Sequence, residues 1–150
     1  MSPRMDYAQA APGSIKALGG LYGYVAQSGL PKQLVDLTYL RVSQINGCAY
    51  CIDMHSRDLL KGGLPVETLV LVPAWREAGD LFDPQERAAL AWAEVVTRVS
   101  ETGVPDADYA AARAVFDEKA LTDLTVAIGL MNTYNRLAIS FRATPQAVRG

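Results

Sequence analysis

The amino-acid sequence predicts an all-α fold. Strand signals are scarce, because no sustained alternation of apolar and polar residues occurs and no Asn-Gly or Asp-Gly turn separates two β-branched runs. Prolines instead precede stretches with helical periodicity, and proline is well suited to the first turn of a helix. The pattern predicts helices at about residues 13–28, 31–46, 48–61, 65–78, 84–100, 106–118 and 122–142.

Glycines and one capping motif set several of these boundaries. Gly19-Gly20 allows close packing in the first helix, and Asn46-Gly47 separates the second helix from the third. Gly62-Gly63 is a strong stop for the third helix, and Gly103 for the fifth. Asp83-Pro84-Gln85-Glu86 predicts a capping box at the start of the fifth helix, with Asp83 as the cap and Glu86 reaching back.

Length and composition indicate a single globular domain over residues 1–150. The chain has a mass of 16.2 kDa, half of its residues are hydrophobic, and its connections are short, so a compact helical bundle is expected. A net charge of −2 gives no electrostatic reason to expect nucleic acid or an anionic membrane as a partner. The first residues do not resemble a secretory signal peptide, and a cytoplasmic location is expected.

The last predicted helix is the most apolar part of the chain. Residues 124–131 are apolar nearly all round, which predicts a helix buried centrally or between subunits. Asn132, Asn135 and Arg136 interrupt it, which argues against a membrane span and favours a structural or interface role for these polar groups. Trp75 and Trp92 lie among apolar helical positions and are predicted to be core or interface anchors.

Cys48, Cys51 and His55 carry the chemistry. In a helix that begins near Cys48, these residues lie at positions i, i+3 and i+7 and share one stripe. A thiolate is a nucleophile, and a second thiol one turn away can trap its oxidised form as a disulfide. His55 is the one histidine of the chain and can act as the base for Cys51 at i+4.

The spacing of the cysteine pair is compatible with other functions. The two thiols could be small buried hydrophobes, or could bind a metal together with His55 and a carboxylate. Haem attachment would need His directly after the second Cys, where Ile52 stands, and a thioredoxin-like site expects a βαβ pattern that is missing here. A redox dithiol on a helical scaffold is the favoured interpretation, with no resident metal or cofactor.

Asp36 is a candidate partner of His55. If the chain turns back at Asn46-Gly47, His55 lies level with about Tyr39, and Asp36 lies within about one further turn. The order would then be carboxylate, imidazole, thiol, with Asp36 orienting or polarising His55. The alternative is an exposed helical ion pair between Asp36 and Lys32, four residues before it, which would contribute little.

The segment from Asp36 to His55 resembles a known family. Ser43-Gln-Ile-Asn-Gly-Cys48, Cys51 and His55 form a string similar to the signature of the alkylhydroperoxidase AhpD-like branch of the carboxymuconolactone decarboxylase family. Leu121-Thr-Asp-Leu and Asn132-x-x-Asn135-Arg136 resemble the final helix of that family, so the similarity extends from about Gln33 to Phe141. The family usually has Glu at the position of Asp36, and its best-studied branch has a second histidine at the position of Tyr50.

The resemblance implies an activity, partners and site roles. It implies that the protein is an antioxidant peroxidase that reduces hydroperoxides and assembles into homotrimers or homohexamers. The implied reductant is a lipoyl-bearing protein or a similar dithiol. Cys51 would attack the peroxide, Cys48 would resolve the sulfenic acid, and His55 would relay protons, with Asp36 at the position of the family carboxylate. A redox-sensing or disulfide-exchange protein without significant peroxide turnover is the alternative.

The two thiols are distinguished by opposing physical effects. Cys48 lies near the helix N-terminus, where the dipole favours a thiolate by typically ~0.3–1 kcal/mol. Cys51 lies one turn from His55, and a positioned general base contributes about 10²- to 10⁴-fold in rate. The base is the larger effect, so Cys51 is expected to be the attacking thiol.

Overall fold

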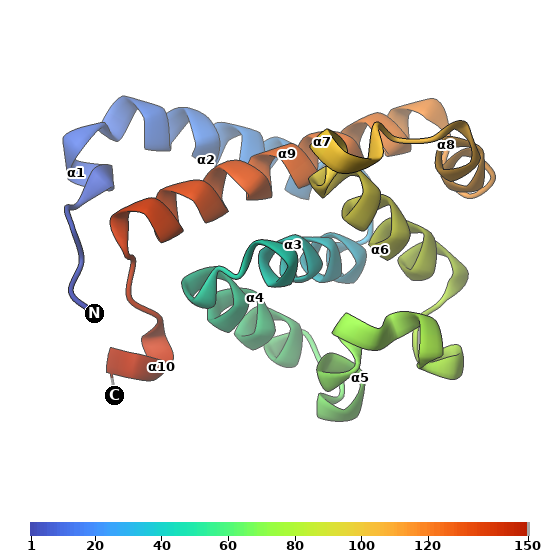
Figure 1. Cartoon of the computed structure of the whole chain (residues 1–150), viewed down its shortest axis with the longest axis horizontal. Helices are drawn as coiled ribbons and strands as arrows, with labels where there is room; N and C mark the ends of the chain where they lie inside the picture. The colour runs from blue at the N-terminus through green and yellow to red at the C-terminus, as the bar shows by residue number, and fades with distance from the viewer. Residues whose placement is uncertain (150) are drawn as a thin grey trace.

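The structure is a computed structural model that describes residues 1–149, and within this range every regular element is a helix. The elements are α1 (Tyr7–Ala10), α2 (Pro12–Ala26), α3 (Lys32–Asn46), α4 (Ala49–Lys61), α5 (Val66–Val70), η1 (Val72–Glu77), η2 (Gly79–Leu81), α6 (Pro84–Thr97), α7 (Val99–Thr102), α8 (Asp106–Arg113), α9 (Glu118–Phe141) and α10 (Gln146–Arg149). Figure 1 shows α3 enclosed by α4, α6 and α9, with α2 running along α9 on the outside. No helix of the described chain is long and apolar enough to cross a membrane.

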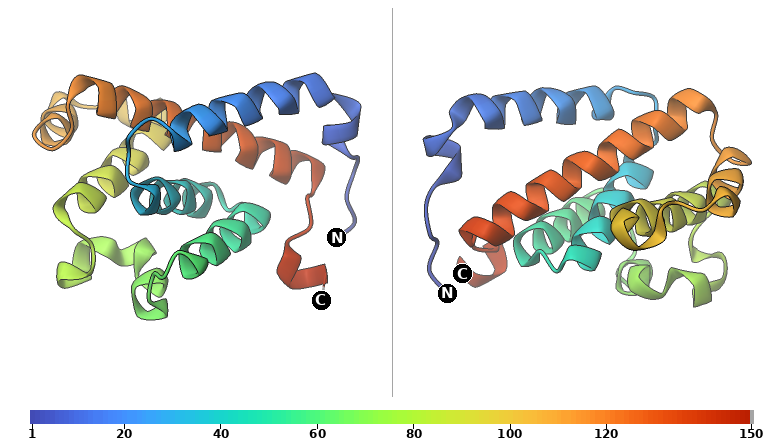
Figure 2. Two further views of the ribbon diagram at one scale, coloured as in Figure 1. Left: turned by 180° about the vertical axis from the view of Figure 1, so that it is seen from behind. Right: turned by 45° about the horizontal axis from the view of Figure 1, so that its top comes forward.

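The most enclosed helix is α3, whereas the sequence pattern predicted that α9 would be buried centrally or between subunits. Residues 34–40 of α3 are buried without interruption, so this stretch is covered on all sides of the helix. The two other views in Figure 2 agree that α3 lies between α4, α6 and α9. On α9, Thr122, Gly129 and Thr133 remain exposed, so one stripe of this helix is uncovered in the single chain.

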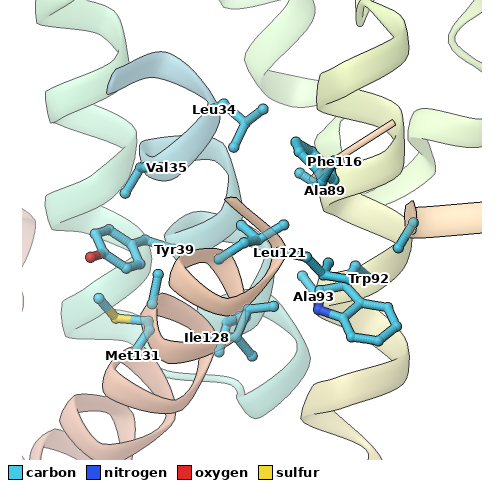
Figure 3. Packing of buried hydrophobic residues seen from close by; sticks show 14 of the residues in the cluster. Leu34, Val35, Tyr39, Ala89, Trp92, Ala93, Phe116, Leu121, Ile128 and Met131 are labelled. Atoms are coloured by element: carbon cyan, nitrogen blue, oxygen red, sulfur yellow. The ribbon is translucent and has the colours of Figure 1, made fainter. Parts of the chain in front are cut away.

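Two apolar clusters fix the packing around α3. One joins α3 to α6 and α9, and its members include Leu34, Tyr39, Trp92, Leu121 and Ile128 (Figure 3). The other lies on the opposite side of α3 and includes Leu37, Leu59 and Trp75. Both tryptophans are buried, as predicted, and each ring N–H is satisfied: Trp75 donates to Glu94 Oε1 and Trp92 to Thr125 Oγ1, both at 2.9 Å.

Several predicted helix boundaries are confirmed. Asp83 and Glu86 form the capping box at the start of α6, with Glu86 N–H donating to Asp83 Oδ1 at 2.8 Å. Helix α4 ends at Lys61, just before Gly62-Gly63. Gly103, in the left-handed conformation, ends the separate short helix α7 and not α6, the fifth helix that it was predicted to stop.

Other predicted boundaries are wrong. The single helix expected over 65–78 divides into α5 and the 3₁₀ turns of η1, because Pro73 removes a backbone donor and Ala74 leaves the helical region (φ −119°, ψ 32°). The helix expected over 84–100 ends at Thr97, and the one expected over 106–118 ends at Arg113. Helix α9 begins at Glu118 rather than 122, since the Asp117 side chain caps it by accepting from Ala120 N–H.

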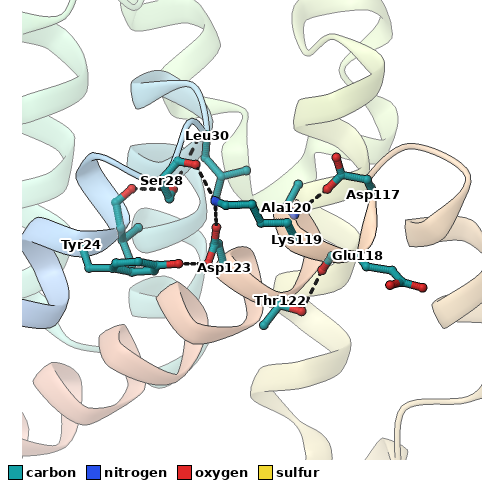
Figure 4. A network of polar contacts seen from close by, with 10 residues as sticks. Tyr24, Ser28, Leu30, Asp117, Glu118, Lys119, Ala120, Thr122 and Asp123 are labelled. Atoms are coloured by element: carbon teal, nitrogen blue, oxygen red, sulfur yellow. Dashed lines mark hydrogen bonds and ion pairs between the residues drawn. The ribbon is translucent and has the colours of Figure 1, made fainter.

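Polar contacts attach α2 to the start of α9. Asp123 accepts hydrogen bonds from Tyr24 Oη at 2.9 Å and from Lys119 Nζ at 2.6 Å, and Lys119 also donates to the Ser28 carbonyl at 2.8 Å (Figure 4). Val25 is the one residue of α2 that is buried, so these bonds contribute strongly to its placement. Their consequence for the site is that Tyr22 of α2 is held against α3.

A second polar network joins the end of α3 to α9. Asn46 Nδ2 donates to Asn132 Oδ1 at 2.9 Å and to Asn135 Oδ1 at 3.0 Å, and Asn135 Nδ2 donates to Ser43 Oγ at 3.1 Å. Ser43 in turn donates to the Tyr39 carbonyl at 2.8 Å. The asparagines that interrupt the apolar pattern of α9 therefore have the structural role that the sequence predicted, and they hold the end of α3 that precedes the cysteines.

Replacing Asn135 by Ala should lower the free energy of unfolding by roughly 2–3 kcal/mol, because it removes the two hydrogen bonds that the buried Asn135 side chain makes with Ser43 and Asn46. Urea denaturation at pH 7 measures this loss. Thr133→Ala is the matched control on the exposed side of the same helix and should change stability by less than about 0.5 kcal/mol. Equal, small effects of both substitutions would contradict a structural role for the network.

Candidate functional site

The turn between α3 and α4 determines where the cysteines lie. Gly47 has a left-handed backbone (φ 70°, ψ 34°), and its N–H bonds to the Gln44 carbonyl at 3.2 Å while Cys48 N–H bonds to the Ser43 carbonyl at 3.0 Å. Glycine adopts this conformation without the strain that a Cβ atom would add. The turn lets α4 begin at Ala49 and run back against α3.

Cys48 and Cys51 form a disulfide at the N-terminus of α4. Cys48 is the N-cap residue, and its Sγ accepts a hydrogen bond from Cys51 N–H at 3.3 Å. Both side chains are buried and pack with Ala138 near the end of α9. Backbone N–H groups and the helix dipole at this end stabilise a thiolate, so the pair is placed to alternate between dithiol and disulfide.

An apolar cavity of about 350 Å³ opens beside Cys48. Its wall comes from the start of α4, the end of α9 and the segment that follows, and includes Ala138, Ile139, Ala143 and Val148. Cys48 belongs to this wall and Cys51 does not, but the bond between the sulfurs places Cys51 directly behind Cys48. A small organic molecule in the cavity would therefore reach the disulfide from the Cys48 side.

His55 lies one turn after Cys51, where the sequence predicted it, and is completely buried. Its ring is tilted against that of Tyr39, with the centroids 5.3 Å apart, which confirms that His55 lies level with Tyr39 across the turn. Within residues 1–149 neither ring nitrogen has a hydrogen-bond partner, Cys51 included. Burial lowers the His55 pKa to about 4, with Asp58 opposing the shift and Lys32 adding to it, so the imidazole is neutral at pH 7.

Asp36 is buried, and its carboxylate pairs with Lys32 Nζ at 2.5 Å. The ion pair of the alternative interpretation is thus present, but the carboxylate is not exposed. Asp36 makes no hydrogen bond to His55, so the structure brings the two residues into the same region without joining them. Burial raises the Asp36 pKa, and the hydrogen bond from Lys32 counteracts that rise.

Tyr22 and Tyr39 belong to the same region and were not among the candidate residues. Their rings stack with centroids 5.9 Å apart, so Tyr39 lies between Tyr22 and His55. The sequence offered one signal, the position of Tyr39 three residues after Asp36 on the same helix. Tyr22 could not be found from the sequence, because its approach depends on how α2 packs. Over residues 1–149 no three His, Cys, Asp or Glu side chains are grouped so that they could hold a metal ion.

Burial of His55 predicts a specific loss of stability in acid. Its folded-state pKa of about 4 lies below the ordinary 6.5, so in this pH interval the unfolded chain binds a proton that the folded chain does not. The free energy of unfolding should fall by roughly 2–3 kcal/mol more in the wild type than in His55→Leu when the pH is lowered from about 7 to about 4.5. Asp36, whose raised pKa acts in the opposite direction, is present in both proteins and cancels. Urea denaturation at both pH values measures the difference. Equal losses of unfolding free energy in the wild type and in His55→Leu would contradict a neutral buried His55.

Comparison with known proteins identifies the family. Residues 12–95 match the model of the carboxymuconolactone decarboxylase family. The chain is 37% identical over 140 residues to the uncharacterized protein YdfG of Bacillus subtilis, covering 93% of this chain and 95% of that protein. It also resembles the alkyl hydroperoxide reductase AhpD of Methylocella silvestris, with 40% identity over 47 residues, which cover 31% of this chain and 26% of that protein.

The fold has a solved counterpart of nearly equal length. The crystal structure of ATU0492 from Agrobacterium tumefaciens, a protein of unknown function related by its description to the antioxidant defence protein AhpD, superposes with a TM-score of 0.91. The two sequences are 42% identical, and the match covers 96% of this chain and 98% of that chain. The chain therefore belongs to the carboxymuconolactone decarboxylase family and is similar, within it, to the AhpD-like proteins.

Proposed function

We propose that this protein is a thiol-dependent reductase of organic hydroperoxides. The observation that carries the proposal is the Cys48–Cys51 disulfide at the N-terminus of α4, with Cys48 in the wall of an apolar cavity and His55 buried one turn further along the helix. The partial similarity to proteins named alkyl hydroperoxide reductase supports the same reaction.

In the oxidative half of the reaction, the Cys51 thiolate attacks one oxygen of the hydroperoxide. The O–O bond breaks, Cys51 becomes a sulfenic acid, and the departing alkoxide takes up the thiol proton to leave as an alcohol. Cys48 then attacks the Cys51 sulfur, the S–S bond forms, and hydroxide leaves with the Cys48 proton as water. Two thiols and one hydroperoxide thus give one disulfide, one alcohol and one water.

His55 passes the proton from the Cys51 thiol to the alkoxide. Its lowered pKa leaves the imidazole neutral at pH 7, so a nitrogen lone pair is available for the Cys51 proton. A base with so low a pKa also returns the proton readily, and the recipient is the alkoxide. Because the ring is completely buried, the exchange takes place out of contact with water.

In the reductive half, an external dithiol enters the cavity beside Cys48. Its first thiolate attacks the Cys48 sulfur and Cys51 leaves as a thiolate, after which the second thiol attacks the mixed disulfide and releases Cys48. The apolar wall of Ile139, Ala143 and Val148 suits a reductant on a hydrocarbon chain, such as a lipoyl group on a partner protein. The same wall favours organic hydroperoxides over hydrogen peroxide.

We also propose a cytoplasmic homo-oligomer, a trimer or hexamer. Helix α2 supports this proposal, because Leu21, Tyr22 and Tyr24 are exposed on it in the single chain. Apolar surface of this kind is commonly covered by a second subunit. A cytoplasmic location agrees with a disulfide that must be reduced again in every cycle.

Trapping the sulfenic acid tests the function and the division of labour. Cys48→Ser treated with one equivalent of cumene hydroperoxide should carry a sulfenic acid on Cys51, which dimedone labels for mass spectrometry, because the resolving thiol is missing. Cys51→Ser should react at least about 100-fold more slowly, since its remaining thiol lacks the base at i+4.

The outcomes separate the competing interpretations. A dimedone adduct on Cys48 in Cys51→Ser would reverse the assigned roles. Wild-type protein that forms the disulfide but does not turn over cumene hydroperoxide with an excess of a recycling dithiol would be a redox sensor or disulfide-exchange protein, not a reductase.

A further inference from the structure

Two buried polar side chains next to one another lack partners inside the protein. The hydroxyl group of Tyr39 and both ring nitrogens of His55 make no hydrogen bond within residues 1–149, although Tyr39 is 1% exposed and His55 0%. Buried polar groups are nearly always hydrogen-bonded, because leaving them unpaired costs free energy. Phenylalanine would fill the place of Tyr39 without this cost, so the hydroxyl group calls for a separate explanation.

Tyr39 also faces the carboxylate that His55 does not reach. A small cavity of about 140 Å³ is lined by Asp36, Lys32 and Tyr39, together with Tyr22 of α2. Asp36 precedes Tyr39 by three residues on α3, so their side chains leave the helix on neighbouring positions of one face. Tyr39 is therefore in contact with His55 on one side and shares a cavity with Asp36 on the other.

We propose that Tyr39 is a positioning residue that connects Asp36 to His55 in the reduced enzyme. The Tyr39 O–H donates to the Asp36 carboxylate, and the Tyr39 oxygen accepts the N–H of one His55 ring nitrogen. This arrangement fixes one tautomer and leaves the lone pair of the other nitrogen for the Cys51 proton. Neither hydrogen bond is present in the structure, whose cysteines are joined, so both bonds are assigned to the reduced form. The assignment rests on the proposed function of His55 as proton acceptor for Cys51.

The charged and titratable groups around this connection are few. Asp58 on α4 and Lys32 on α3 act on His55. Tyr22 on α2, Asp36 on α3 and Tyr134 on α9 act on Tyr39, and burial raises the Tyr39 pKa, so its phenol stays protonated and able to donate. Of these groups, Asp36 is the buried carboxylate that shares a cavity with the Tyr39 side chain.

Alkylation of Cys51 tests the connection without any peroxide. In a Cys48→Ser background Cys51 is the single thiol, and its rate with iodoacetamide over pH 5–9 reports thiolate formation. Tyr39→Phe and Asp36→Asn should each slow this reaction about 10-fold at pH 7 and move the midpoint of the pH profile upward, as loss of a group that orients a neighbour does. The double variant should be no slower than the slower single variant, because both act through one connection.

Controls and a second measurement keep the test decisive. Tyr134→Phe removes a phenol that also acts on Tyr39 but makes no hydrogen bond to His55, and it should leave the rate and the profile unchanged. A Tyr39→Phe protein that behaves like Tyr134→Phe, or losses that multiply in the double variant, would overturn the proposal.

The single histidine of the chain allows an independent readout. Nitrogen NMR of reduced wild-type protein should show one fixed neutral tautomer for His55, whereas a mixture of tautomers would overturn the proposal even if Tyr39→Phe did not fold. None of these measurements requires hydroperoxide turnover. A failure of turnover would therefore refute the proposed reductase activity and leave the connection through Tyr39 standing. Unchanged alkylation in the variants would refute the connection and leave the reductase activity standing.

Discussion

The chain reverses its direction at Gly47, whose left-handed conformation ends α3 and allows α4 to begin two residues later. Because the reversal is so short, Cys48 becomes the N-cap residue of α4 and Cys51 lies in its first turn. The same reversal brings the next turn of α4, with His55, against Tyr39 of α3. A residue with a Cβ atom would be strained at Gly47, and a longer loop would separate the thiols from the helix terminus that stabilises their ionised form.

The surroundings of this turn explain its chemistry. Asn46 and Asn135 attach the end of α3 to α9, and Ala138 on α9 packs over the two sulfurs. The enclosure removes water from His55 and keeps it neutral, while the apolar cavity lies on the Cys48 side of the disulfide. The base and the cavity therefore lie on different sides of the disulfide, and in the proposed reaction both the hydroperoxide and the reductant enter on the Cys48 side.

Much of the site could be predicted from the sequence, because its residues lie within one helical hairpin. The spacing of Cys48, Cys51 and His55 fixed their common stripe, and the glycine turn placed His55 beside Tyr39. Contacts that depend on tertiary packing could not be predicted. The stacking of Tyr22 on Tyr39 depends on the position of α2. The separation of Asp36 from His55 depends on side-chain directions and on the ion pair of Asp36 with Lys32.

For the fold, too, local features could be predicted from the sequence and tertiary packing could not. Local signals such as the capping box at Asp83 and the stop after Lys61 were sufficient for those boundaries. One helix was predicted around Pro73 because the apolar periodicity continues through this residue. Proline has no backbone N–H to donate, so the α-helix does not continue through it. The central position of α3 was missed because Asp36, Thr38 and Ser43 are polar yet buried, and their partners come from their own helix or from α9.

The most direct test of the account counts thiols and alcohol in a single turnover of the fully reduced wild-type protein. One equivalent of cumene hydroperoxide should give one cumyl alcohol and remove two thiols per chain, and peptide mapping should place the new disulfide between Cys48 and Cys51. If the thiols remain reduced while the peroxide is consumed, or if they are oxidised no faster than free cysteine at the same pH, the Cys48–Cys51 pair is not a hydroperoxide reductase.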